Sequence, residues 1–119
     1  MFDSITQTAL DQELFCSENA RLTGNEGKAR VCARRAAGIA VRALFNASGE
    51  TIRDPSAFAV LNHLGQLETT PGHIKEAIAR LLTRVAPDYT LPIQADIIAD
   101  ARVLIAWAAE QIKEIKFDR

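Results

Sequence analysis

The sequence has no long hydrophobic run. No stretch approaches the roughly 18 apolar residues that a membrane-spanning helix needs. The N-terminus, MFDSITQTALDQ, also lacks the basic start and apolar stretch of a signal peptide. Neither sign of charge is in excess, because 14 Lys and Arg against 15 Asp and Glu leave a net charge of −1. We therefore predict a cytoplasmic protein without membrane association, in which any site for a polyanion is a local patch.

Cysteine and histidine are scarce, with two of each: Cys16, Cys32, His63 and His73. None of them has another Cys, His or carboxylate at the spacing of metal ligands, so we predict no metal site. Both cysteines lie inside apolar helical patterns, which predicts buried thiols; a disulfide or a reactive thiol is the alternative. The sequence also lacks a nucleophile motif and a phosphate-binding loop of the required spacing. We therefore assign no catalytic residue and no cofactor.

No segment alternates convincingly between apolar and polar residues, so no sheet is expected. Four polar breaks divide the chain instead, at residues 23–25, 48–55, 70–71 and 86–92. They carry helix punctuation, for example Asp54-Pro55, an N-cap acid followed by a proline at the first helical position. A chain of 119 residues can bury a core without staples. These features predict one all-α domain over residues 1–119, an antiparallel bundle of about five helices at roughly 3–22, 26–47, 55–66, 71–86 and 92–115.

The last predicted helix has an unusually wide apolar face. Seven residues form one stripe along it: Ile93, Ile97, Ala101, Leu104, Ala108, Ile112 and Ile115. Ile98, Ile105 and Trp107 widen this stripe to roughly 180°, whereas burial on one side needs roughly 100°. The first helix also carries apolar residues outside its main stripe, such as Phe15 and Leu22. We predict a homodimer through the apolar faces of the first and last helices, with deep burial inside one chain as the alternative.

The second predicted helix combines a small-residue face with a basic one. Six alanines share one face: Ala29, Ala33, Ala36, Ala37, Ala40 and Ala47. Gly38 lies off this face and predicts a second close contact, because a mid-helix glycine costs about 1 kcal/mol relative to alanine. Lys28, Arg35 and Arg42 fall within roughly 40° on the opposite side. Such a stripe predicts contacts with the phosphates of RNA or a nucleotide. A solvated face paired with acids such as Glu13 is the alternative.

The third and fourth predicted helices are shorter and each has one apolar stripe. In the third, Phe58, Leu61 and Leu64 stand near core spacing, so all three are expected to face the core. The fourth has the most regular stripe in the chain, formed by Ile74, Ala77, Ile78, Leu81, Leu82 and Val85. Each helix is therefore expected to turn one face to a core.

The order of these segments resembles a known family. A long helix pair comes first, and its second member is rich in alanine and arginine (ARRAAGIA, residues 33–40). A shorter helical part follows, then RVAPDYTLP at residues 84–92, and then a closing helix that contains DARVLIAWA at residues 100–108. This layout resembles the HEPN superfamily of small helical bundles found in prokaryotes.

The resemblance implies a bundle that dimerises, so that two Arg-x(4–6)-His motifs meet in one cleft. Active members of the family are metal-independent ribonucleases, often toxins paired with an antitoxin or a nucleotidyltransferase. In that chemistry arginine stabilises phosphate charge and histidine moves a proton. Here Arg84 is followed by Tyr89 where the family has histidine, and tyrosine, with a pKa of about 10, is a poor proton shuttle at neutral pH. The resemblance thus implies the fold, with Arg84 and Tyr89 as ligand contacts, but not the nuclease activity.

Three functions follow from these observations. We predict a non-catalytic module that binds RNA or a nucleotide, or serves as an accessory subunit. Its expected ligand-binding residues are Arg84, Tyr89, Lys28, Arg35 and Arg42. The first alternative is a divergent metal-independent ribonuclease of the toxin–antitoxin type. The second is a helical interaction or dimerisation protein without a nucleic-acid ligand.

Overall fold

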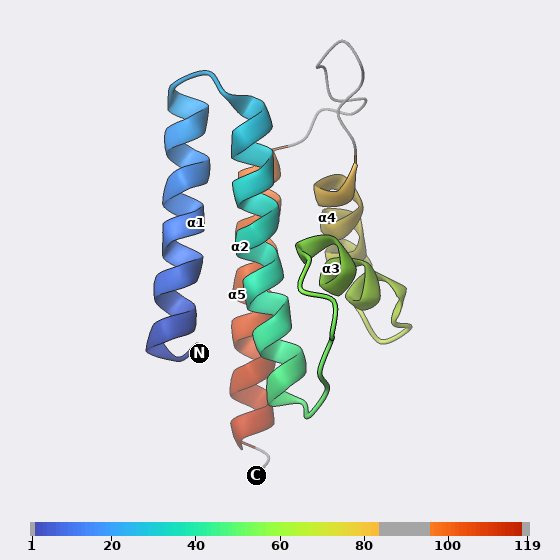
Figure 1. Cartoon of the computed structure of the whole chain (residues 1–119). Coiled ribbons are helices and arrows are strands. Elements are labelled where there is room, and N and C mark those ends of the chain that lie inside the picture. The colour runs from blue at the N-terminus through green and yellow to red at the C-terminus, as the bar shows by residue number, and fades with distance from the viewer. Residues whose placement is uncertain (1, 84–95, 118–119) are drawn as a thin grey trace.

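The computed structural model describes residues 2–83 and 96–117, and helices make up most of this part of the chain (Figure 1). Five helices follow one another: α1 (Ser4–Leu22), α2 (Glu26–Ala47), α3 (Ala57–Gln66), α4 (Gly72–Leu82) and α5 (Ile97–Phe117). The described residues contain no strand. The predicted all-α class is therefore confirmed.

Helices α2 and α5 form the centre of the bundle, with α1 on one side and α3 and α4 on the other (Figure 1). Helices α1 and α2 run in opposite directions, whereas α5 runs in the same direction as α2. An ion-pair cluster joins the start of α2 to the start of α5. Arg21, at the end of α1, binds Glu26 at the start of α2 and Asp96 just before α5, each with an N–O distance of 2.8 Å. A wholly antiparallel order is therefore not confirmed.

Side-chain caps mark the described starts of α3 and α5, and α3 begins two residues later than its proline signal predicted. Helix α3 begins at residue 57, because the Ser56 hydroxyl accepts a hydrogen bond from the Ala59 N–H (3.1 Å). Helix α5 begins at residue 97, because the Asp96 carboxylate accepts from the Ala99 N–H (3.1 Å). The predicted start at residue 55 was therefore wrong, whereas the predicted start at residue 92 lies outside the described residues. A side chain that reaches the free N–H groups of the first turn decides a helix start, and proline offers no such group.

The fourth helix is shorter than its apolar stripe. Thr70 does not cap it, because its hydroxyl donates instead to the Leu64 carbonyl (2.8 Å), and α4 begins at residue 72. Thr83 adopts an extended backbone (ψ 132°), so α4 ends at residue 82 rather than 86.

Two hydrophobic clusters lie on the two sides of the central pair. The larger joins α2, α3, α4 and α5 and has residues such as Val41, Leu61 and Leu104 at its centre. The smaller joins α1, α2 and α5: Leu10, Ala40, Leu44, Ala108 and Ile112. Because α5 faces both clusters, burial within one chain accounts for its wide apolar arc. The homodimer stays a prediction.

The small residues of α2 let its neighbours approach closely. Ala33, Ala36, Ala37 and Ala40 are completely buried. A Cβ atom added to Gly38 would lie 2.8 Å from the Cβ of Ala57, at the start of α3. The close contact predicted at Gly38 is therefore confirmed, and it is made with α3.

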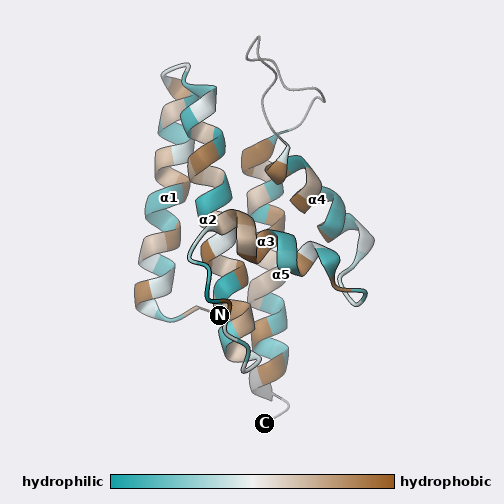
Figure 2. Ribbon diagram, turned by 45° about the vertical axis from the view of Figure 1, so that its right-hand side comes forward, coloured by the Kyte–Doolittle hydropathy of each residue, from teal (hydrophilic) through white to brown (hydrophobic). Residues whose placement is uncertain are grey.

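Several large apolar side chains face solvent. Phe58 is 55% exposed although its neighbours Leu61 and Leu64 are buried, so the expectation that it faces the core was wrong. Ile5, Phe15 and Leu22 are exposed on α1. Figure 2 shows hydrophobic and hydrophilic residues interleaved along α1. None of the helices within residues 2–83 and 96–117 is long and apolar enough to cross a membrane.

Candidate functional site

A cleft of about 690 Å³ lies on the outer face of α2, between α1 and the start of α3. Helix α2 forms its floor, Thr6 and Glu13 line it from α1, and residues 55–60 line it from the other side. Three arginines of α2 line this cleft: Arg34, Arg35 and Arg42. The only carboxylate among the lining residues is that of Glu13, so the cleft carries excess positive charge.

Arg42 holds the wall of the cleft that leads into α3. Its guanidinium donates to the carbonyls of Ile52 and Asp54 (both 2.7 Å) and of Ser56 (3.3 Å). Hydrogen bonds from Ser56 lower the pKa of the Asp54 carboxyl, and the charge of Arg42 adds to this effect. Arg42 therefore holds the wall of the cleft. It acts on a ligand through its charge and not through direct contact.

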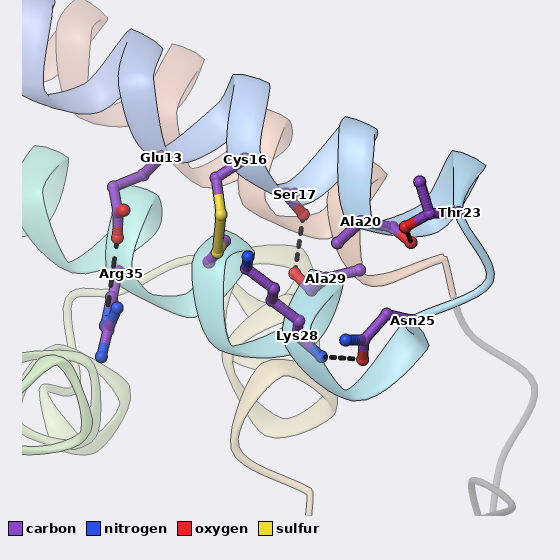
Figure 3. The surroundings of a disulfide bond; sticks show 10 residues. Glu13, Cys16, Ser17, Ala20, Thr23, Asn25, Lys28, Ala29 and Arg35 are labelled. Carbon is purple, nitrogen blue, oxygen red and sulfur yellow. Dashed lines mark hydrogen bonds and ion pairs between the residues drawn. A yellow bond between two sulfur atoms is a disulfide. The ribbon is translucent and has the colours of Figure 1, made fainter.

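Arg35 is the most available cation of the cleft. Its side chain is 64% exposed, and its Nε lies 4.0 Å from an Oε atom of Glu13 (Figure 3). A contact of this length made by an exposed guanidinium is weak, although Glu13 itself is partly buried. The structure thus shows the pairing with an acid at this residue, and the binding of a phosphate by Arg35 stays a prediction.

Arg34 lies at the inner edge of the cleft. Its Nε donates to the Leu81 carbonyl at the end of α4 (3.0 Å), and the side chain is half-buried. Burial lowers the pKa of the Arg34 guanidinium. The residue thus links α2 to α4 and adds its charge to the cleft floor.

The other predicted ligand contacts are not part of this cleft. Lys28 lies in the first turn of α2, where its backbone N–H donates to the Asn25 side chain (3.0 Å; Figure 3). Its side chain is exposed but does not line the cleft. Arg84 and Tyr89 lie outside the described residues. The structure therefore brings together Arg35 and Arg42 of the predicted set.

Phe58 is the cleft residue that the sequence interpretation missed. It comes from the first turn of α3 and lines the cleft beside Pro55 and Ala57. A helical wheel of α3 could have predicted that Phe58 lies outside the core. Val60, Leu61 and Leu64 are centred roughly 110° from Phe58, so the core face of α3 points elsewhere. The basic stripe of α2 has no aromatic residue that could stack on a base, and Phe58 provides an exposed aromatic ring in the same cleft as the arginines.

A disulfide fixes the α1 wall of the cleft. Cys16 and Cys32 are bonded to each other, with their Cα atoms 6.1 Å apart (Figure 3). The prediction of buried thiols was therefore wrong. Cys16 stands eight residues before Gly24 and Cys32 eight residues after it, and residues equally distant from the turn of a helical hairpin face each other. Glu13 and Arg35 also stand equally far from Gly24, one turn farther along each helix, and they face each other for the same reason.

The histidines are not part of the cleft. His63 Nε2 lies 3.1 Å from Glu50 Oε1, and the ring packs edge-on against Phe45 with centroids 5.1 Å apart. Within residues 2–83 and 96–117, no three His, Cys, Asp or Glu side chains are grouped in a way that could hold a metal ion.

No protein-family model matches this chain, and no curated protein or solved structure matches it either. The resemblance to the HEPN superfamily therefore stays a prediction, and the arguments for function come from the cleft.

Proposed function

We propose that the chain is a non-catalytic binding module whose cleft on α2 takes a nucleotide or a short segment of single-stranded RNA. One observation carries this proposal. Arg35 from α2 and Phe58 from α3 line the same cleft, and both side chains are largely exposed. A guanidinium binds phosphate, while an aromatic ring stacks on a base. A nucleotide presents both groups on one molecule.

The charge and the size of the cleft agree with this ligand. Three guanidinium groups against one carboxylate attract a phosphate. The volume of about 690 Å³ falls within the roughly 300–1,000 Å³ of small-molecule sites. The cleft is therefore large enough for one nucleotide.

The walls of the cleft are held in place before a ligand binds. The Cys16–Cys32 disulfide ties α1 to the floor, and Arg42 ties the segment before α3 to it through three carbonyls. Groups that are already ordered lose less entropy on binding. This rigidity supports a binding role for a cleft that has no catalytic group of its own.

The HEPN-like interpretation forms part of the proposal. Arg84 and Tyr89 enter it as further ligand contacts on the sequence resemblance alone. The ribonuclease alternative makes a distinct prediction: RNA cleavage without metal that is lost in Arg84→Ala. The binding module leaves the RNA intact.

The test is the affinity for a fluorescent single-stranded RNA ten-mer, measured by anisotropy at low salt. Stacking on an aromatic ring is worth about 1–3 kcal/mol per base, so Phe58→Ala weakens binding by roughly 10-fold or more. Arg35→Glu weakens it further and flattens the salt dependence. The matched controls are Phe15→Ala, an exposed phenylalanine on α1 outside the cleft, and Lys113→Glu on α5.

The comparison between the variants and their controls decides the outcome. Equal affinities for Phe58→Ala and Phe15→Ala contradict the proposal, as does a wild-type protein that does not bind the RNA. Competition by AMP shows that the cleft takes a single nucleotide. Competition only by longer RNA shows that the ligand extends beyond it.

The exposed apolar residues of α1 favour a second candidate function, the predicted homodimer. Ile5 and Leu22 are more than four-fifths exposed, and Phe15 is 70% exposed. A homodimer through this helix is expected to dissociate in Phe15→Glu, as measured by light scattering. A wild-type protein that is monomeric contradicts the homodimer and leaves the proposal for the cleft unchanged.

A further inference from the structure

Arg30, in the second turn of α2, is a buried charge without a partner. The residue is only 4% exposed, and its Nη1 and Nη2 atoms find no hydrogen-bond acceptor among the described residues. Guanidinium stays protonated in proteins, so Arg30 cannot escape this situation by losing its charge. A buried charge is costly unless it is paired. The site therefore needs an anion.

Among the described residues, three carboxylates at this end of the bundle already have their own arginines. Glu26, one turn before Arg30, accepts hydrogen bonds from Arg21 on both oxygens (2.8 and 3.4 Å). Asp96 also accepts from Arg21. Asp100 is bound on both oxygens by Arg80 (2.9 and 3.0 Å). None of the three carboxylates is left for Arg30.

The group next to Arg30 is a second cation. Arg34 follows one turn later, and its Nε reaches the Leu81 carbonyl at the end of α4. Burial lowers the pKa of Arg30, and the charge of Arg34 lowers it further. Two neighbouring guanidinium groups present several N–H donors to one acceptor, which suits an oxyanion with more than one oxygen.

We propose that Arg30, with Arg34 beside it, binds a phosphate group between α2 and the end of α4. The group is either inorganic phosphate or the phosphate of a larger ligand, since the shared chemistry is that of a tetrahedral oxyanion. Arg30 does not line the cleft on α2, so this site is separate from the one that Phe58 and Arg35 form.

The experiment is thermal unfolding of the whole chain at pH 7, with sodium phosphate exchanged for sodium chloride at constant ionic strength. Phosphate well above its dissociation constant is expected to raise the Tm of the wild-type protein by roughly 5 °C, and the shift is expected to grow with the logarithm of the phosphate concentration. Arg30→Met is expected to lose this response. Lys113→Met, at an exposed cation of α5 outside both sites, is expected to keep it.

The behaviour of Arg30→Met in chloride is a second readout. Methionine fills the buried space without an unpaired charge, so its Tm in chloride is expected to equal or exceed that of the wild type. If Arg30→Met lowers the Tm in chloride and the wild type does not respond to phosphate, Arg30 is paired within the protein and the proposal fails. A phosphate response that Arg30→Met retains also overturns it.

A further variant covers the case in which Arg30→Met does not fold. Arg30→Lys keeps the charge but loses the fork of donors, and a reduced phosphate response is expected. An unchanged response contradicts the proposal. Adding AMP in place of phosphate distinguishes the sources. A larger shift with AMP that Arg30→Met loses assigns the phosphate to a nucleotide, whereas a shift with AMP that Arg30→Met keeps comes from the cleft on α2. The RNA proposal stands or falls separately, on Phe58→Ala and Arg35→Glu.

Discussion

The two sides of the central α2–α5 pair are built differently. On the side of α3 and α4, a continuous cluster of fifteen buried apolar residues holds the helices together. On the side of α1, the cluster has five buried residues, and Leu10 is the only one that α1 contributes. Apolar burial thus dominates on the side of α3 and α4, where Arg34 and Arg80 add polar links to it. The side of α1 has fewer buried residues and depends more on specific links.

The links of α1 are of several chemical kinds. The disulfide and the buried hydrogen bond from the Ser17 hydroxyl to the Ala29 carbonyl (2.6 Å) join it to α2 (Figure 3). Ion pairs of Glu18 with Arg102 and of Arg21 with Asp96 join it to α5. The attachment of α1 to the bundle is therefore expected to depend on redox state and salt concentration, whereas the attachment of α3 and α4 is expected to depend mainly on apolar packing.

Removing the disulfide is expected to have the largest effect on this comparison. Its closed loop spans a sequence separation of 16 residues, which corresponds to about 3 kcal/mol of stabilisation. The double variant Cys16→Ser/Cys32→Ser should lose about this much free energy of unfolding in urea. Its amides should exchange hydrogen faster along α1 than along α4.

The control for this experiment is thiol alkylation without reductant. The unfolded wild-type protein should show no free thiol, and reductant should not change the stability of the double variant. Two free thiols in the oxidised protein contradict the disulfide and restore the buried thiols that the sequence predicted.

Filling the contact between α2 and α3 is expected to have an intermediate effect. In Gly38→Ala the new methyl group meets the Cβ of Ala57 at 2.8 Å. Overpacking costs about 1–3 kcal/mol, and alanine returns about 1 kcal/mol of helix propensity, so we expect a net loss of about 1 kcal/mol.

The matched control for Gly38→Ala is Gly27→Ala. The Cβ added at residue 27 meets only the Asn25 side chain, at 3.8 Å. This variant is expected to become more stable in the same urea experiment. If both substitutions change the free energy of unfolding in the same direction, the close contact at Gly38 is contradicted.

The ion pair between α1 and the start of α5 is expected to have the smallest effect. Hydrogen bonds from Arg21 and, secondarily, from the Ala99 N–H lower the pKa of Asp96. A carboxyl with a lowered pKa stabilises the protein above its ordinary pKa, and this contribution is lost as the pH falls through the folded value. Asp96→Asn keeps a capping group but removes the charge.

The measurement is the free energy of unfolding of Asp96→Asn and wild type at pH 7 and at acid pH. For an exposed pair we expect a loss of about 0.5 kcal/mol at pH 7, and a smaller difference below about pH 4. Glu114→Gln, an exposed charge on α5, should change nothing at either pH. A difference that persists in acid shows that the Asp96 charge is not the cause.

The fold was largely predictable because helix signals are local. The apolar stripe of α4 and the alanine face of α2 needed only the spacing of residues along one helix. The start of α3 was misplaced, because the Ser56 side chain rather than Asp54-Pro55 caps its first turn. The symmetry of the cysteines about Gly24 was also visible in the sequence and would have predicted their pairing.

The sequence by itself determined the helices, their buried faces and the basic stripe of α2, because each depends on a period within a single helix. Only the tertiary structure decided the role of each cation. It holds Arg42 with loop carbonyls, leaves Arg35 near solvent and buries Arg30 without a partner. It also brought Phe58 to the same cleft as Arg35. These roles depend on which groups from distant segments meet, and no helical period contains that information.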